Sequence, residues 1–168
     1  DEDRLISFRV LYFPGFNEDN PGRDFGLAAD ELKLVAHLPL SNVHPDYTGN
    51  VLQKKMTLYA VELAEVTREF NYLCSNVSPK NYPSMAEKFS IGMHVAALKE
   101  KYGGFWRYIF RKDMRQALSY QEKDAVFVAT DDYQRQSELL QLGYVGFKAG
   151  LGDEKNGVYF AKPEEKKS

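Results

Sequence analysis

Apolar residues recur at the helical spacing of three and four in the middle of this chain, and this spacing limits the possible folds. The first such stretch begins at Met56 and places one stripe along a helix: Met56, Ala60, Leu63, Thr67 and Phe70. A second helix is predicted from Ser84, which forms a capping box with Glu87, to Tyr102, before the left-handed stop of two glycines. Its predicted stripe is Ile91, Val95, Leu98 and Tyr102. Two amphipathic helices need a further layer to cover these stripes.

Elsewhere the apolar residues alternate, which is typical of strands. Strands are predicted over 5–13, 32–38, 105–110, 125–129, 144–147 and 158–161, with a loop over 41–49 and a short helix over 130–142. Asn156-Gly157, between the last two strands, is a hairpin signal. No internal repeat is visible. Helices segregated from a run of strands predict an α+β fold, with two helices packed on a mainly antiparallel sheet.

The composition excludes several classes of ligand. The 168 residues include 22 basic and 24 acidic residues, scattered along the chain, and the formal net charge is −2. Such a chain has no field of one sign to attract nucleic acid or an anionic membrane, and no apolar run is long enough to span a bilayer. A lone cysteine, Cys74, cannot form an internal disulfide and fits a reducing cytoplasmic compartment. Protein partners are therefore expected.

The residue types that carry most enzyme chemistry do not form a recognisable pattern. His37, His44 and His94 have no Cys, Asp or Glu at metal-ligand spacing, which predicts that no metal is bound. Cys74 is expected to behave as a small hydrophobic residue. Gly103-Gly104 closes a helix, whereas a phosphate cradle requires the start of one. We therefore predict no catalytic residue, no cofactor and no enzymatic activity.

Four segments resemble the dynein light chain family of the eight-kilodalton class. The segments are the helix residues Met56, Val61-Glu62, Ala64 and Glu69-Phe70-Asn71, the run Leu-Lys-Glu-Lys-Tyr-Gly-Gly-Phe-Trp-Arg-Tyr-Ile over 98–109, and the later strands over 122–128 and 147–150. The resemblance implies a dynein-light-chain-like α+β domain over 31–150. Residues 1–30 would be an N-terminal extension with a strand, and 151–168 a C-terminal hairpin strand with a charged tail.

This resemblance implies a non-catalytic assembly subunit that forms homodimers or heterodimers and holds extended partner segments by strand addition. The implied partners are dynein heavy or intermediate chains or other light chains. The implied location is a microtubule-based complex of the cytoplasm and cytoskeleton, such as the axoneme of a cilium. Residues 114–121 depart from the family's groove strand, which predicts a specialised, permanent subunit. The residues implied in partner binding are Lys112, Met114, Arg115, Gln116, Ala117, Leu118, Ser119, Tyr120 and Phe127.

Two alternatives stay open. The segment 125–132, followed by a short helix, Leu142-Gly143-Tyr144 and a terminal hairpin, resembles the end of a GNAT acetyltransferase, an acyl-CoA-dependent transferase. That family holds the cofactor pyrophosphate with an Arg or Gln and Gly-x-Gly or Gly-x-Ala at a helix start. The match found in this chain, Ser90-Ile-Gly-Met-His, lies inside a predicted helix. The second alternative is a scaffold subunit of another large assembly with the same α+β layout.

Overall fold

The computed structural model describes residues 4–49, 51–67, 70–151 and 155–164. The fold is α+β, as predicted. Its helices are α1 (Leu52–Thr67), α2 (Tyr82–Ser90) and α3 (Tyr133–Gln141). Its strands are β1 (Ser7–Arg9), β2 (Val35–His37), β3 (Ser41–Val43), β4 (Tyr72–Val77), β5 (His94–Lys101), β6 (Phe105–Asp113), β7 (Val126–Ala129), β8 (Val145–Leu151) and β9 (Asn156–Ala161). Short 3-10 helices are η1 (Pro21–Phe25), η2 (Leu32–Leu34), η3 (Pro45–Tyr47) and η4 (Glu122–Asp124). Among the described residues, no helix has the length and apolar character needed to cross a bilayer.

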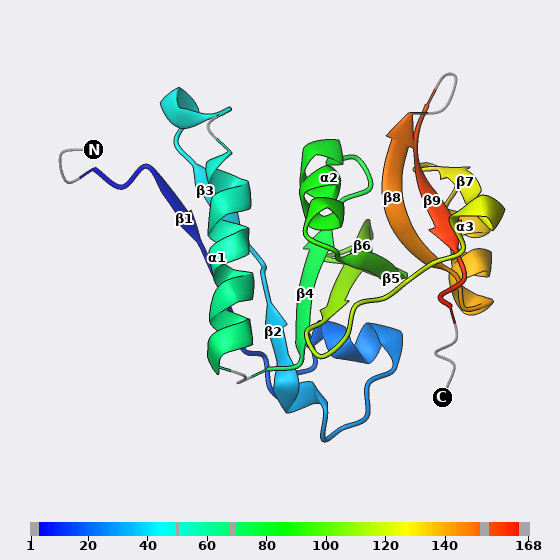
Figure 1. The fold of residues 1–168 in the computed structure, drawn as a ribbon, viewed down its shortest axis with the longest axis horizontal. Coiled ribbons are helices and arrows are strands. Elements are labelled where there is room, and N and C mark those ends of the chain that lie inside the picture. The colour runs from blue at the N-terminus through cyan, green and yellow to red at the C-terminus, as the bar shows by residue number, and fades with distance from the viewer. Residues whose placement is uncertain (1–3, 50, 68–69, 152–154, 165–168) are drawn as a thin grey trace.

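Seven strands of the described chain form one sheet in the order β2-β4-β6-β5-β8-β9-β7 (Figure 1). The strands β2 and β4 are parallel, and the other neighbours in this sheet are antiparallel. The strands β1 and β3 form a separate antiparallel pair. A parallel pair at one end of an otherwise antiparallel sheet needs a crossover connection, and α1 supplies it.

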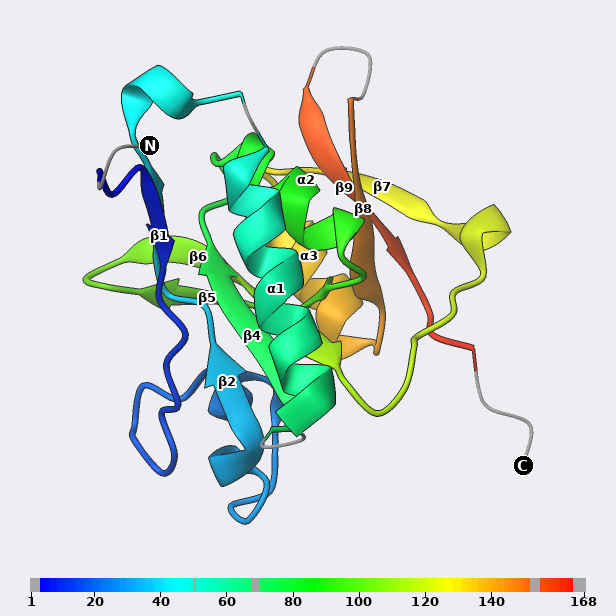
Figure 2. The same cartoon turned by 60° about the vertical axis from the view of Figure 1, so that its left-hand side comes forward.

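The strand β4 lies between two hydrophobic layers because its successive side chains point to opposite faces. Leu73 packs in the larger core with Val61 of α1. Tyr72, on the other face, packs in a smaller cluster with Phe25 of η1, and the two ring centroids are 6.4 Å apart. Figure 2 shows α1 and α2 together in front of β4. The two helices thus cover the same face, and η1 covers the opposite one.

The second helix is shorter than the sequence pattern predicts. It was expected to run from Ser84 to Tyr102, but α2 ends at Ser90 and β5 follows. Gly92, between them, has a φ of 77°, a left-handed conformation that ends the helix. Asn81 is the N-cap, and its side chain accepts a hydrogen bond from the Ser84 amide at 3.2 Å. Two of the four residues of the expected apolar stripe, Val95 and Leu98, therefore lie on a strand.

The interior strand β4 is absent from the sequence prediction, in which residues 72–83 form an insertion. Five of its six residues are buried and the other is half-buried, so it lacks the alternation used to find strands. The helix over 130–142 and the strands over 105–110, 125–129, 144–147 and 158–161 are confirmed, with small changes at their ends. The first helix begins at Leu52, before the expected start at Met56.

The chain contains two copies of one folding unit, which corrects the prediction of no internal repeat. The copies are β4–α2–β5–β6 and β7–α3–β8–β9, and in each the last strand lies between the other two. Helices α2 and α3 both begin at a tyrosine, and Asn81 and Asp132 cap them in the same way. Gly92 and Gly143 follow the two helices with φ of 77° and 82°. The range 82–92 corresponds to 133–143 in the second copy, and the two are identical only at Tyr82, Glu87 and Gly92. The repeat is therefore not visible in the sequence.

The two copies meet where β5 pairs with β8. The paired residues are Val95 and Gly146, and each is the last residue before a bulge in its own copy. Because equivalent residues pair antiparallel, a local two-fold axis passes between them. The helices follow this symmetry, since α2 contacts β8 and α3 contacts β5. The described strands on both sides of the predicted boundary at 150 and 151 share one sheet, and the division into domains stays a prediction.

Candidate functional site

A polar cleft opens where the two parallel strands part. Leu38, just after β2, still donates its amide to the carbonyl of Cys74 at 2.8 Å. Beyond Pro39 the chain turns away, and β3 pairs with β1 instead of β4. The opening, here called the strand cleft, has a volume of about 380 Å³. It is bordered by Ser75 and Asn76 of β4 and by Ser78, the residue that follows β4. It lies at the carboxyl ends of parallel strands, where α/β sheets commonly bind ligands.

The N-terminus of α1 opens on a second cavity beside this cleft. The chain passes from β3 through η3 and Gly49, which has a φ of 84°, into the helix at Leu52. The cavity, here called the helix cavity, has a volume of about 350 Å³ and is bordered by Gly49, Val51, Lys54 and Glu87. Gln53 and Pro83 border both cavities, so the two adjoin. A helix start of this kind presents backbone amides and a partial positive charge.

Val51 carries backbone strain at this helix start. Its φ is 51°, in the left-handed region that a β-branched side chain rarely adopts. Its side chain is largely exposed, at 60%, so burial of the valine does not offset this strain. The position comes two residues after Gly49, where a Gly-x-Gly pattern has its second glycine. The strain is therefore located at the loop that precedes the amides of α1.

A buried carboxylate joins α2 to α1 and β1 where the two cavities adjoin. Glu87 Oε1 accepts from Arg9 Nη2 at 2.9 Å and from the Thr57 hydroxyl. Its Oε2 accepts from Lys88 Nζ at 2.7 Å and from Gln53 Nε2 at 3.0 Å. Four donors occupy the lone pairs of this one carboxylate. This group, here called the Glu87 network, holds three segments together that are distant in sequence.

The two cations of this network are almost completely buried. The side chains of Arg9 and Lys88 are 6% and 3% exposed. Burial lowers the pKa of both groups, and the attraction of Glu87 opposes this shift in each case. Both hydrogen bonds of Arg9 leave from Nη2, and its buried Nε has no partner among the described residues. Two positive charges thus share one negative charge at the border of the strand cleft.

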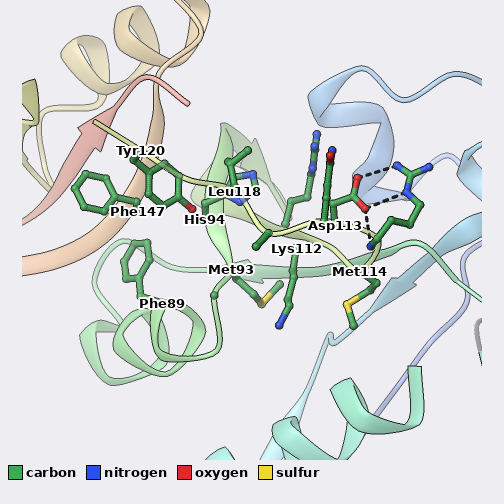
Figure 3. A pocket seen from close by; sticks show the side chains of 14 residues that line it. Phe89, Met93, His94, Lys112, Asp113, Met114, Leu118, Tyr120 and Phe147 are labelled. Atoms are coloured by element: carbon green, nitrogen blue, oxygen red, sulfur yellow. Dashed lines mark hydrogen bonds and ion pairs between the residues drawn. The ribbon is translucent and has the colours of Figure 1, made fainter. Parts of the chain in front are cut away.

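The residues predicted to bind a partner gather at a different place (Figure 3). A cavity of about 420 Å³ lies near the junction of the two copies, and Phe89, Met93 and Phe147 form its apolar wall. Tyr120 stacks on Phe147 with ring centroids 5.0 Å apart, as the close-up shows. Seven of the nine predicted residues border this cavity: Lys112, Met114, Arg115, Gln116, Ala117, Leu118 and Tyr120.

The other two predicted residues lie elsewhere. The Ser119 carbonyl accepts from the Glu164 amide at 2.9 Å, and Phe127 of β7 packs on Tyr159 with ring centroids 5.1 Å apart. Within 114–121 only Tyr120 forms a β-bridge, to Pro163, so the segment is not a groove strand. Asp113 holds Arg115 by two side-chain bonds, at 3.0 and 2.7 Å, which fixes the start of the segment. Partner binding by the nine residues stays a prediction.

Two buried histidines and the cysteine lie side by side across the sheet. His37 pairs with Cys74, Cys74 with Arg111, and Arg111 with His94, on four adjacent strands. Burial, with a contribution from nearby cations, lowers the pKa of His37 to about 4 and that of His94 to about 3. Burial raises the pKa of the Cys74 thiol, which disfavours the reactive thiolate. In the described part of the chain, no three potential metal-ligating side chains come together.

No family model and no curated protein matches the chain. Solved structures do resemble it, among them three acetyltransferases. An aminoglycoside acetyltransferase in complex with coenzyme A has a TM-score of 0.52 and 14% identity, over 67% of this chain and 61% of that one. A proposed acetyltransferase from Salmonella typhimurium, with its cofactor acetyl-CoA, has a TM-score of 0.51 and 14% identity, over 71% and 64%. A GNAT-family acetyltransferase from Bacillus anthracis has a TM-score of 0.50 and 12% identity, over 68% and 62%.

The fold is that of the GNAT acetyltransferases. This chain spans 61–64% of the length of those three proteins. The finding overturns the dynein light chain resemblance, and with it the expectations of a non-catalytic light chain, dynein partners and a microtubule-based complex. The expectation that the chain is not an enzyme is also contradicted. The short motifs that suggested a light chain occur on elements of another fold, since the run 98–109 spans a β5–β6 hairpin and not the end of a helix.

The strand cleft and the helix cavity are both bordered by residues of the segment 41–49, which was predicted to be a loop. The Ser90-Ile-Gly-Met-His segment was predicted to lie inside a helix, but Ser90 is the last residue of α2. The helix start that does follow a strand is that of α1, after Gly49. A glycine between a strand and an amphipathic helix is the available signal. Placing the helix start at Met56 separated Gly49 from it, and nothing in the sequence shows that Arg9, Glu87 and Lys88 meet.

Proposed function

We propose that the chain is an acyl-CoA-dependent transferase that acts in the strand cleft. One observation carries this proposal: β2 and β4 run parallel and then part, and the opening lies before the N-termini of α1 and α2. The solved relatives in fold include one with coenzyme A and one with acetyl-CoA. A polar opening at this position is a general ligand site in sheets with parallel strands.

The helix cavity fits the diphosphate of such a coenzyme. A Cβ added to Gly49 would meet nothing within 4 Å, so the space before the loop is open. The backbone of Val51 and Leu52 begins α1, a helix of 16 residues, and the Lys54 side chain borders the same cavity. Amides, a helix dipole and a cation all favour phosphate. Gly49, Val51, Leu52 and Lys54 would therefore hold the coenzyme, although Val51 departs from the second small residue of the Gly-x-Gly or Gly-x-Ala pattern.

Acyl-coenzyme A, when bound, would supply a thioester from which the acyl group passes to an acceptor amine: a C–N bond would form, the C–S bond would break, and the amine proton would go to the coenzyme sulfur. The chain's residues orient the reactants at the strand cleft. Asn81 and Ser84, at the start of α2, present a second helix N-terminus to it. Lys88 holds a proton at Nζ in a buried position at the border of the cleft, and its lowered pKa makes that proton easier to release.

The experiment is calorimetric titration of the protein with coenzyme A and acetyl-CoA, compared with the Gly49→Glu variant. A carboxylate beside the helix start would repel the diphosphate, so the variant should bind at least about tenfold more weakly. Gly143→Glu is the matched control, because Gly143 has nearly the same φ, 82°, and equally open surroundings. It should bind as the parent does. Saturable binding that Gly49→Glu leaves unchanged, or no binding by the parent, would reject the proposal.

A further inference from the structure

The border of the strand cleft carries an uncompensated positive charge. Arg9 and Lys88 are both cations, and among the described residues Glu87 is the one carboxylate that contacts either. Its four acceptor positions are filled by four donors, so it cannot bind Arg9 or Lys88 through further bonds. A buried charge without a counter-ion is costly, so a ligand that supplies the opposite charge would reduce this cost.

The donors of these cations are not exhausted. Arg9 Nε is buried and has no partner in the described part of the chain. The Lys88 ammonium has three hydrogens and, among the described residues, makes one hydrogen bond, to Glu87. Both residues border the strand cleft, which has space for a small polar group. Arg107 of β6 borders it as a third cation, and its guanidinium lies over the rings of Tyr102 and Phe105.

The start of α2 adds to the same field. Asn81, Pro83 and Ser84 border the strand cleft, and they form the cap and first turn of that nine-residue helix. Its partial positive charge therefore acts on the same opening as Arg9 and Lys88. Among the described side chains, α1 and β1 contribute Gln53, Thr57 and Arg9 to the network, and none of these is acidic.

We infer that one substrate of the transferase carries a carboxylate or phosphate that binds between Arg9 and Lys88 in the strand cleft. This inference rests on the proposed function and names the class of its substrate. The anionic group belongs either to the transferred acyl chain, as in a dicarboxylic acyl thioester, or to the acceptor, as in an amino acid. Both sources present the same chemistry to the two cations.

The first test uses free succinate and its neutral analogue succinamide, without any coenzyme. Succinate should bind the parent saturably and raise its melting temperature, and succinamide should not. Lys88→Met removes one cation and leaves Arg9 paired with Glu87, so the network becomes neutral. Succinate binding should then weaken by about 10- to 100-fold, the range expected for losing a charge-assisted hydrogen bond. Lys155→Met, which removes an exposed cation paired with Asp131, should bind succinate as the parent does.

A structural role for Lys88 predicts a different result. If it only supported the fold, Lys88→Met would lower the melting temperature and leave the succinate affinity of the folded protein unchanged. Removal of a desolvated second cation should instead keep or raise the stability without ligand. Equal succinate affinity in parent and variant would overturn the inference.

The second test separates the two sources and the two proposals. Titration of succinyl-CoA against acetyl-CoA should show tighter binding of succinyl-CoA, lost in Lys88→Met, if the acyl chain carries the anion. If the acceptor carries it, the two thioesters should bind equally and succinate should compete with an amino-acid acceptor. Lys88-dependent succinate binding without any coenzyme binding would retain the anion site and reject the transferase. Coenzyme binding without Lys88-dependent succinate binding would retain the transferase proposal and reject the anion site.

Discussion

Val95 of β5 and Gly146 of β8 occupy the same position in the two copies of the folding unit and pair with each other at their junction. A Cβ on Gly146 would lie 3.0 Å from the Cβ of Val95 and 2.8 Å from Val158 Cγ1. Both distances are too short for an ordinary contact. The local symmetry is therefore broken at its axis, where one copy has a side chain and the other has none.

Gly146→Val should destabilise the protein. The added side chain must displace Val95 or Val158, both fully buried, and overpacking of this kind costs about 1–3 kcal/mol or more. Urea denaturation measures the loss in free energy of unfolding. Gly143→Asn is the control, because its φ of 82° suits asparagine and no atom lies near the added Cβ. An equally stable Gly146→Val variant would mean that the junction is loosely packed.

Glu87→Gln should be strongly destabilising, because it leaves Arg9 and Lys88 buried without a counter-charge. The expected cost is about 3–5 kcal/mol, as for breaking a buried ion pair. The second copy supplies a matched control, since Glu138 has the same place on α3 but pairs with Arg135 on the surface. Glu138→Gln should change stability by less than about 0.5 kcal/mol. Similar losses for the two variants, measured by urea denaturation, would contradict a buried Glu87 network.

Stability should fall in mild acid because two histidines are buried in the neutral form. The folded pKa is about 4 for His37 and about 3 for His94, below the value of 6.5 for a free histidine. Between these values the unfolded chain binds more protons, so the stability present above pH 6.5 is lost as the pH falls. Each histidine should contribute a loss of about 3 kcal/mol by about pH 4.

His94→Gln should remove its part of this pH dependence, because glutamine does not titrate. The measurement is the free energy of unfolding in urea at several pH values between about 7 and 4. The variant should be less stable than the parent at neutral pH and show a shallower decline. If the free energy of unfolding of the variant depends on pH as that of the parent does, His94 is in contact with water in the folded protein.

The two helix caps should contribute equally and independently. Asn81→Ala and Asp132→Ala each remove a side chain that accepts an amide hydrogen bond, at 3.2 and 3.0 Å, and each should cost about 1 kcal/mol. The double variant should lose the sum, since the caps share no partner. Thermal or urea denaturation of the three variants checks this. A double variant that loses much more than the sum would mean that the two caps are energetically coupled.

Local patterns in the sequence determined those helices and strands that have one apolar and one polar side. The stripe from Met56 predicts α1, and alternation in the ranges 105–110 and 144–147 predicts two strands of the sheet. These features are readable because each element has one apolar and one polar side, with a fixed period. The α+β class follows from their order. The prediction that the chain is not an enzyme relied on spacing within single segments, and the acetyltransferase fold contradicts it.

Tertiary structure decided the parts in which local signals were missing or misleading. The strand β4 is buried on both faces and has no alternation, and Gly92 ends a helix whose apolar spacing continues into β5. The Glu87 network joins Arg9, Gln53 and Lys88 from three distant elements, and the register of neither helix nor strand indicates that they meet. The pairing of Val95 with Gly146 likewise depends on which strands become neighbours. The sequence specifies the faces of each element, whereas the packing of those faces decides which distant charges share a cleft.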